Sequence, residues 1–258
     1  MDKFIKIAIE AAGRAGELLK RKMQNTSIVR EKRGAVDIVT SADLEAQKLI
    51  INLISREFPH HGILAEEREV EIQKNSPLIW AIDPIDGTSA FAHGLPTYSS
   101  SIALLKDRQP IVGAIYVALT DEVIWAAKGK GTFARKNKLL VSPLVNLRET
   151  AIGFDPGYFR REESIKKIAA SLSDRVRIMP MTWSQAASLA LVARGNLGGY
   201  IQCGNPRVWD AAAGKLLVEE AGGIVTEFSG KSIDLFSLDG YIAGTPEVHR
   251  QLLKFIRS

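Results

Sequence analysis

The sequence has a single cysteine, Cys203, among its 258 residues. One thiol excludes an internal disulfide and a cysteine-rich zinc site. It also fits a reducing compartment, so we expect a cytoplasmic protein. Long apolar runs are missing as well, because the longest, such as Ile111 to Leu119, falls far short of the ~20 residues that span a bilayer. Charge begins at Asp2 and no signal-peptide core follows, so we expect no membrane partner.

The remaining composition is ordinary for a globular protein, with 46% hydrophobic and 24% charged residues. A chain of this length can bury a real core and forms one large or two small domains. The net charge of +5 favours anionic substrates, and it equally favours loose binding to RNA. Charge alone therefore does not choose between an enzyme and a nucleic-acid binder.

The most informative stretch runs from Leu78 to Thr88 and reads LIWAIDPIDGT. Its apolar first half predicts a strand buried on both faces, which leads directly into Asp83 and Asp86. Buried charge is costly unless something neutralises it. Pro84 bends the chain so that the two acids can converge, and a hard cation between them removes their repulsion. The stretch therefore predicts a metal site.

The residues after the two acids point to a phosphate. Gly87 permits backbone angles that other residues avoid and lets a ligand approach the main chain. Thr88 opens a short helix that we expect to reach Ala92, and N–H groups at a helix start bind anions. The alternative is an Asp-Pro turn followed by an Asp-Gly turn. Because the strand, both acids and the threonine occur together, we favour a metal beside a phosphate.

The first half of the chain predicts two helices packed on a mostly antiparallel sheet. Apolar residues recur at helical spacing over residues 4–19, and Thr40 with Asp43 matches a capping box before a second helix that Pro59 ends. The basic stretch Arg30–Gly34 is expected to be an exposed mobile loop. Short strands joined by tight turns imply antiparallel neighbours, and we expect them at 62–67, 99–105, 111–119, 123–127, 132–134 and 138–141.

From about Ser142 the pattern changes to alternating strands and helices. We expect strands at 151–154, 176–179, 199–202, 224–228 and 241–243, and helices at 161–172, 184–194, 210–221 and from Pro246 onward. Gly222 and Gly223 end the third of these helices like a left-handed cap. The predicted organisation is an N-terminal α+β half, residues 1–142, and a C-terminal α/β half, residues 143–258. The two halves form one compact unit with the active site between them.

Several motifs together resemble a known family. The stretch Trp80–Thr88, continued by Phe91 and by Gly94–Pro96, is similar to the signature of the inositol monophosphatase family, and Trp209–Gly214 with Glu220–Gly223 is similar to its second signature. Two minor motifs of the family resemble Asp37–Thr40 with Asp43, and Ala65–Glu67. The match covers nearly the whole chain in the family's order. It implies a layered α/β/α/β/α sandwich, of mixed α+β and α/β character, and a magnesium-dependent, lithium-sensitive phosphomonoesterase that forms a homodimer.

The resemblance also implies roles for individual residues. Two or three Mg²⁺ ions, for which Mn²⁺ can substitute, are expected on the side chains of Glu66, Asp83, Asp86 and Asp210 and on the carbonyl of Ile85. The catalytic residues are expected to be Asp43, Glu66 and Thr88, with Asp43 and Thr88 orienting and deprotonating the attacking water. The substrate-binding residues are expected to be Asp86, Gly87, Thr88, Ser184, Cys203 and Arg207, and Lys32 matches a lysine on the family's mobile loop. An all-oxygen ligand set independently favours Mg²⁺ or Mn²⁺ over zinc.

The sequence departs from the family where the alcohol is recognised. Members specific for inositol carry an acid at the position of Cys203, and small residues where this chain has Trp183 and Gln185. Arg207 is either a contact for a second phosphate or a solvated surface arginine. We therefore expect hydrolysis of inositol 1-phosphate with broader sugar-phosphate activity. Fructose 1,6-bisphosphate, adenosine 3′,5′-bisphosphate and histidinol phosphate are the alternative substrates.

Two other classes of protein remain as alternatives. Haloacid-dehalogenase-like phosphatases use an Asp-x-Asp motif with an aspartyl nucleophile, but two residues separate Asp83 from Asp86. Some bacterial proteins that resemble this chain associate with the transcription machinery, and the basic residues Arg30–Arg33 could contact RNA or a protein partner. A pure binding protein has no need of a complete set of metal ligands, so binding ranks as a second role.

Overall fold

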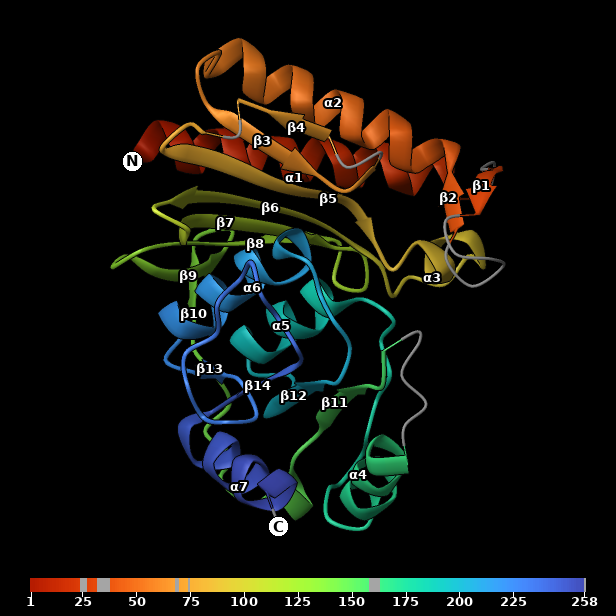
Figure 1. Cartoon of the computed structure of the whole chain (residues 1–258), viewed down its shortest axis with the longest axis vertical. Coiled ribbons are helices and arrows are strands. Elements are labelled where there is room, and N and C mark those ends of the chain that lie inside the picture. Colours follow the sequence, from red (N-terminus) through yellow and green to blue (C-terminus); the bar gives the residue numbers. More distant parts are fainter. Residues whose placement is uncertain (24–26, 32–37, 68–69, 74, 158–162, 258) are drawn as a thin grey trace.

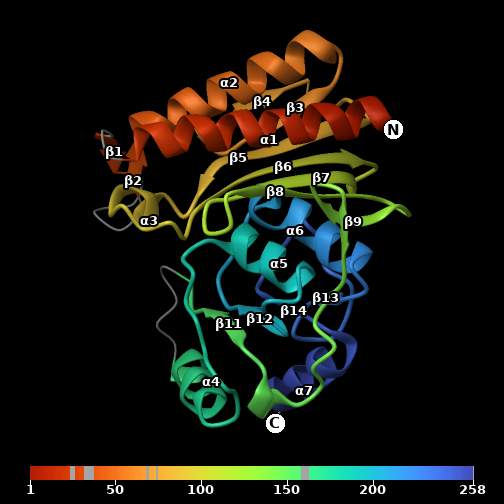
Figure 2. The same ribbon diagram turned by 180° about the vertical axis from the view of Figure 1, so that it is seen from behind.

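The computed structural model describes residues 1–23, 27–31, 38–67, 70–73, 75–157 and 163–257. Its elements lie in five layers (Figure 1), and the view from behind shows the same order (Figure 2). Two helices cover an eight-stranded sheet, two more lie between it and a four-stranded sheet, and the last two are outermost. This arrangement confirms the predicted layered sandwich. The longer helices are α1 (Asp2–Lys22), α2 (Ser41–Glu57), α4 (Glu163–Ser173), α5 (Gln185–Ala193), α6 (Val208–Glu220) and α7 (Pro246–Arg257).

The eight-stranded sheet has the order β10-β9-β8-β7-β6-β5-β3-β4. Every neighbouring pair is antiparallel except β3 and β5, which run parallel. The predicted, mostly antiparallel sheet is therefore confirmed, whereas β4 was not predicted. The strands are β3 (Gly62–Ala65), β4 (Val70–Ile72), β5 (Leu78–Asp86), β6 (Ser99–Lys106), β7 (Gln109–Val117), β8 (Glu122–Ala127), β9 (Gly131–Ala134) and β10 (Asn137–Leu139).

Small residues on the inner face of α1 bring this helix close to the sheet. Ala8, Ala11 and Ala15 are fully buried, as the helical spacing predicts. A Cβ atom on Gly16 would lie 2.4 Å from the ring of Tyr116 on β7, so only glycine fits there. The core beneath α1 and α2 is one apolar cluster, and a second cluster lies between the sheet and the helices α5 and α6.

Strand β5 continues past Pro84 and bends there. Asp83 pairs with Ser101 of β6 and Asp86 pairs with Ser99, so one more residue lies between the partners on β5 than on β6. This irregularity suits proline, which cannot donate to a ladder, and a bulge of this kind redirects the side chains that follow. The alternative of an Asp-Pro turn that ends the strand is therefore wrong.

The second half of the chain builds a mixed four-stranded sheet in the order β11-β12-β14-β13. β11 and β12 are parallel, and the other pairs are antiparallel. A third apolar cluster lies between this sheet and the outer helices α4 and α7. The division into halves at residue 142 stays a prediction. The strands are β11 (Ile152–Asp155), β12 (Gly199–Gln202), β13 (Ile224–Thr226) and β14 (Tyr241–Gly244).

Local expectations fail at three places. Arg30 belongs to strand β1 (Ile28–Glu31), which pairs with β2 (Ile38–Thr40), so the predicted loop begins as a strand, and its remainder lies outside the described residues. The strand expected at 176–179 is reduced to one bridge, because Pro180 has no N–H with which to extend a ladder. Helix α6 begins two residues earlier than predicted, so Asp210 is its third residue and not its cap.

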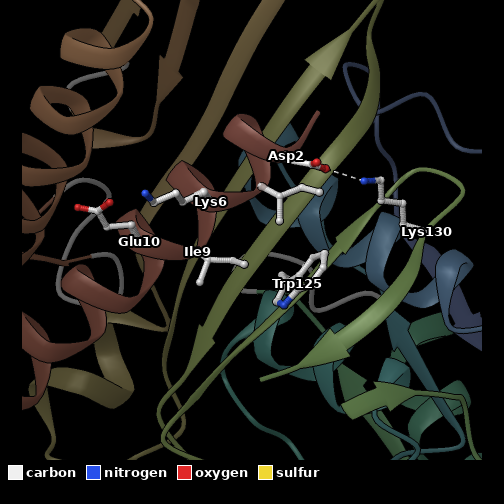
Figure 3. A pocket seen from close by; sticks show the side chains of 7 residues that line it. Asp2, Lys6, Ile9, Glu10, Trp125 and Lys130 are labelled. Carbon is white, nitrogen blue, oxygen red and sulfur yellow. Dashed lines mark hydrogen bonds and ion pairs between the residues drawn. The ribbon is translucent and has the colours of Figure 1, made fainter. Parts of the chain in front are cut away.

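A pocket of about 500 Å³ opens beside the first turns of α1. Its walls include Ile9 and Trp125, and an ion pair of 2.7 Å between Asp2 and Lys130 lies at its edge (Figure 3). It is at the end of α1 away from the short helix α3 (Thr88–Ala92), whose predicted bounds are confirmed. The helices of the described ranges include none long and apolar enough to cross a membrane.

A buried histidine makes the stability of the outer layer depend on pH. His249 on α7 is 5% exposed, and its Nε2 lies 2.9 Å from Thr226 Oγ1 on β13. Burial lowers the pKa of His249 below its ordinary value of 6.5. The folded protein therefore favours the neutral ring. This contribution to stability is fully present above the unfolded-state pKa and is lost as the pH falls through the lower folded pKa. Wild type should lose unfolding free energy between about pH 7 and about pH 5, and we expect His249→Gln to lose less over the same range.

Urea unfolding across this range measures the effect, and exposed His93 provides the matched control. We expect His93→Gln to keep the wild-type dependence on pH. A wild-type dependence in His249→Gln would contradict the prediction.

Candidate active site

Carboxylates from three separate elements meet at the carboxyl end of β5. Asp83 and Asp86 belong to β5 and are only 2% and 9% exposed. Glu66 directly follows β3, the parallel neighbour of β5, and its N–H donates to Ile82 O at 3.1 Å. Asp210 lies in the first turn of α6, which packs on the other face of the sheet. The parallel pairing and the helix packing thus place the other three predicted carboxylate ligands within electrostatic range of Asp83.

These carboxylates are near enough to affect one another's protonation. Burial raises the pKa of Asp83 well above its ordinary value, and the charges of Glu66, Asp86 and Asp210 raise it further. Burial likewise raises the pKa of Asp86 to about 7. A cluster of this kind is stable near neutral pH when it binds protons or a cation.

The donor set fits a hard divalent cation. Asp83 Oδ1 is buried and has no hydrogen-bond partner among the described residues. Such an atom is costly in a folded protein unless a ligand satisfies it. In the described part of the chain no three His, Cys, Asp or Glu side chains already have the spacing of an assembled ion site. The charges of Glu66, Asp86 and Asp210 nevertheless raise the pKa of Asp83, so these carboxylates lie within electrostatic range of it. Oxygen donors are the ligands that Mg²⁺ prefers.

Another buried acid, Asp43, connects the carboxylate cluster to Thr88. Its Oδ2 accepts the N–H and the hydroxyl of Thr40 at 2.7 and 2.6 Å, so the predicted capping box is confirmed. Its Oδ1 lies 3.1 Å from Thr88 Oγ1, which is also 2.9 Å from Ile85 O. One hydroxyl proton cannot serve both acceptors. Burial raises the pKa of Asp43 to about 7, so near neutral pH its protonation decides whether Thr88 donates to it or to Ile85.

Helix α5 holds Asp86 in position. The Asp86 carboxylate accepts hydrogen bonds from Ser184 Oγ at 2.8 Å and from Ala186 N–H at 2.5 Å. The same serine caps α5 through Ala187 N–H at 3.1 Å, and its hydroxyl lies 2.9 Å from that of Ser99 on β6. Ser184 was predicted to bind substrate. The structure places it beside Asp86, where it can also orient that carboxylate.

Gly87 lies in a confined turn directly after the acids. Its φ of 91° is in the left-handed region that glycine adopts without strain. A Cβ atom at this position would lie 3.0 Å from Trp183 O and 3.1 Å from Thr97 O. Gly87 therefore keeps the backbone of this turn close to the residues that begin α5, as expected for a site where a ligand approaches the main chain.

The remaining predicted residues have different surroundings. Arg207 is exposed, and its backbone N–H donates to Asp210 Oδ2 at 2.7 Å, which closes the first turn of α6. Cys203 is 1% exposed and belongs to the outer apolar cluster, so its packing agrees with a small apolar core residue. Its predicted contact with substrate stays a prediction. Lys32 and Asp37 lie outside the described residues.

Sequence reasoning missed polar residues that surround the cluster. Ser99 and Ser101 on β6 are buried, and Ser101 Oγ donates to Trp209 O beside Asp210 at 3.1 Å. Three consecutive serines in an otherwise apolar strand were the available signal. Asp155 and Gln202, at the ends of β11 and β12, interact with each other at 3.2 Å. Nothing in their local sequence marks these two, because only the sheet brings them together.

Comparison with known proteins agrees with this arrangement. The profile described as "Inositol monophosphatase family" matches residues 1–258. "Fructose-1,6-bisphosphatase/inositol-1-monophosphatase" of Thermotoga maritima is 33% identical, covering 96% of this chain and 94% of that protein. "Nus factor SuhB" of Vibrio cholerae is 32% identical, covering 100% and 97%. The crystal structure of the "extragenic suppressor protein suhB" of Bartonella henselae superimposes with a TM-score of 0.92 at 32% identity, covering 99% of both chains.

The layered fold and the buried carboxylates next to a confined glycine turn fit the class of phosphatases to which these relatives belong. The chain belongs to the inositol monophosphatase family. A solved structure with the same fold, described as "IMPase/NADP phosphatase complexed with Mg2+ and phosphate", is 24% identical and superimposes with a TM-score of 0.81, covering 93% of this chain and 90% of that chain.

We expect Asp83→Asn to separate metal binding from folding. The folded pKa of Asp83 is raised, so wild-type stability decreases as the pH rises towards it, and asparagine removes that loss. Without metal the variant should therefore be at least as stable as wild type at neutral pH. A Mg²⁺ concentration of about 100 times Kd should stabilise wild type by about 2.7 kcal/mol and the variant far less. Thermal unfolding with EDTA and with Mg²⁺ measures both effects.

Asp107, an exposed aspartate in the turn between β6 and β7, supplies the control. Asp107→Asn should respond to Mg²⁺ as wild type does. Equal stabilisation of Asp83→Asn and wild type by Mg²⁺ would show that Asp83 is not a ligand.

Proposed function

We propose that this protein hydrolyses phosphate monoesters of polyols, with inositol 1-phosphate as the first candidate, by attack of water at a magnesium site. The observation that carries the proposal is the unsatisfied Asp83 Oδ1 within a buried carboxylate cluster beside Gly87 and Thr88. The names of the relatives support the substrate, because the Thermotoga protein is named for inositol 1-phosphate and fructose 1,6-bisphosphate.

In this proposal the ligands are Glu66, Asp83, Asp86 and Asp210 together with the Ile85 carbonyl. The number of ions is two or three, and Mn²⁺ can substitute. Bound magnesium would lower the pKa of water and neutralise the phosphate. The protein's own contribution is to hold these oxygens in place through the bend of β5, the start of α5 and the first turn of α6.

Asp43 and Thr88 supply the route for the proton. Thr88 Oγ1 accepts a proton from the attacking water as its own proton moves to Asp43 Oδ1, 3.1 Å away. A pKa of about 7 suits Asp43 to this role, because a general base works best when its pKa lies near the working pH. Glu66 orients the water from the side of β3. The N–H groups of Gly87 and Thr88 bind the phosphate, and Ser184 assists at the start of α5.

We propose that the enzyme is cytoplasmic, as the single cysteine suggests. From the resemblance to the family we also propose that it is a homodimer and that lithium inhibits it. A titration with LiCl tests inhibition, and a measurement of mass in solution tests dimer formation.

We expect activity to need Mg²⁺ or Mn²⁺ and to survive a zinc-selective chelator, because all proposed ligands are oxygens. Phosphate release from inositol 1-phosphate, fructose 1,6-bisphosphate, adenosine 3′,5′-bisphosphate, NADP and histidinol phosphate identifies the substrate. Asp210→Asn should reduce kcat/KM by ~10²-fold or more, since a missing ligand weakens the metal site.

The control for these measurements is again Asp107→Asn, which should keep wild-type kinetics. Full turnover in metal-free buffer would disprove metal dependence. A near wild-type rate for Asp210→Asn would show that Asp210 only closes the first turn of α6.

A second role is favoured by the relative of Vibrio cholerae that is named a Nus factor. The net charge of +5 suits contact with an anionic partner such as RNA. Retention of the protein by RNA or by RNA polymerase at physiological salt tests this role, and loss of binding there removes it.

A further inference from the structure

The carboxyl ends of two parallel strands form a second polar group next to the carboxylate cluster. β11 ends at Asp155 and β12 ends at Gln202, and these two residues are partners in the parallel register. In sheets of this kind, ligands bind outside the carboxyl ends of the strands. Strand β12 packs against helix α5, whose first residues bind Asp86, so this polar group and the carboxylate cluster border the same helix.

Hydrogen bonds fix the orientation of the Asp155 carboxylate. Its Oδ1 accepts Gly157 N–H at 2.8 Å, and its Oδ2 accepts Gln202 Nε2–H at 3.2 Å and the Tyr200 hydroxyl at 3.4 Å. Gln202 is itself fixed, because its Oε1 accepts Gly204 N–H at 2.8 Å. The amide of Gln202 therefore presents its N–H₂ group to Asp155.

Of Asp155, Gln202 and Tyr200, only Asp155 is accessible to solvent. Tyr200 and Gln202 are both 1% exposed, whereas Asp155 is partly exposed. A carboxylate has about four acceptor positions, and the described residues occupy three of them. Asp155 thus retains capacity to accept a hydrogen bond from a ligand, with Tyr200 and Gln202 behind it.

Strand alternation explains why Cys203, the residue that follows Gln202, does not take part in this polar group. Side chains of β12 point to opposite faces in turn. Ile201 and Cys203 belong to the outer apolar cluster, while Tyr200 belongs to the inner cluster next to α5 and α6. The backbone N–H of Cys203 donates to Asp155 O at 2.9 Å, while its side chain packs in the outer cluster. On the neighbouring strand β11, Asp155 supplies an acid beside Gln202.

We propose that Asp155 determines specificity by accepting hydrogen bonds from hydroxyl groups of the substrate's alcohol, with Gln202 and Tyr200 as positioning residues. The substrate class is the phosphate monoester of a cyclitol or sugar with free hydroxyl groups. The inference rests on the proposed phosphatase function and deepens it. It adds a residue for alcohol recognition to the broader sugar-phosphate activity that is expected from Cys203.

The test compares inositol 1-phosphate with cyclohexyl phosphate, which has the same ring size and no hydroxyl groups. We expect wild type to prefer inositol 1-phosphate, and Asp155→Asn to reduce the ratio of the two kcat/KM values by ~10- to 100-fold, the range that a hydrogen bond to a charged group supports. The change should fall mainly on KM for inositol 1-phosphate. Gln202→Leu should reduce the ratio less, because it removes one of the bonds that orient Asp155.

Matched controls separate this role from metal binding and folding. Asp107→Asn should keep the wild-type ratio, and Asp155→Asn should still be stabilised by Mg²⁺, whereas Asp83→Asn should lose most of that stabilisation. If Asp155→Asn does not fold, Asp155→Glu moves the carboxylate by one methylene and should also reduce the ratio.

Distinct outcomes overturn distinct claims. Hydrolysis of both esters with the same ratio in wild type and Asp155→Asn would disprove the role of Asp155 and leave the phosphatase function intact. A ratio that changes in Cys203→Ser and not in Asp155→Asn would return the role to position 203. Failure of wild type to hydrolyse any phosphate monoester with Mg²⁺ would disprove the proposed function itself.

Discussion

Repulsion between buried carboxylates is the constraint on which this structure depends. Asp83, Asp86 and Asp43 are nearly or fully buried, and each has a raised pKa. Burying such groups costs free energy unless donors or a cation compensate. The fold supplies donors at helix starts: Asp43 is bound at the start of α2, Asp86 at the start of α5, and Asp210 at the start of α6. Each of these three acids is therefore held at the positive end of a helix dipole.

This arrangement explains the mixture of rigid and irregular structure around the site. The long strand β5 runs through the core, and its irregularity lies at Pro84, directly between the two acids. Gly87 then turns the chain close to the residues that begin α5. Asp83 Oδ1 is a buried carboxylate oxygen for which the described chain provides no hydrogen-bond partner. In the proposed enzyme, a bound cation compensates this oxygen.

The two sheets contribute different parts of the site. The eight-stranded sheet carries Asp83 and Asp86, and Glu66 follows its strand β3. The four-stranded sheet carries Asp155 and Gln202 at the ends of its parallel pair. In the proposed enzyme, the side that faces the alcohol can change without altering the metal ligands, because the two groups come from separate layers. This separation would let one fold serve several phosphate esters.

The sequence by itself determined the layered fold, the bounds of α3, the capping box at Thr40 and Asp43, and the carboxylates at the end of β5. Each of these depends on local spacing, on turn chemistry, or on long motifs whose order along the chain is specific. Only the tertiary structure decided that Cys203 packs in the outer cluster, that Ser184 binds Asp86, and that Asp155 lies beside Gln202. Residues 155 and 202 become neighbours through strand register, and strand alternation decides which side chains share a face. The spacing of residues along the chain gives neither the strand register nor the face of the sheet on which a side chain lies.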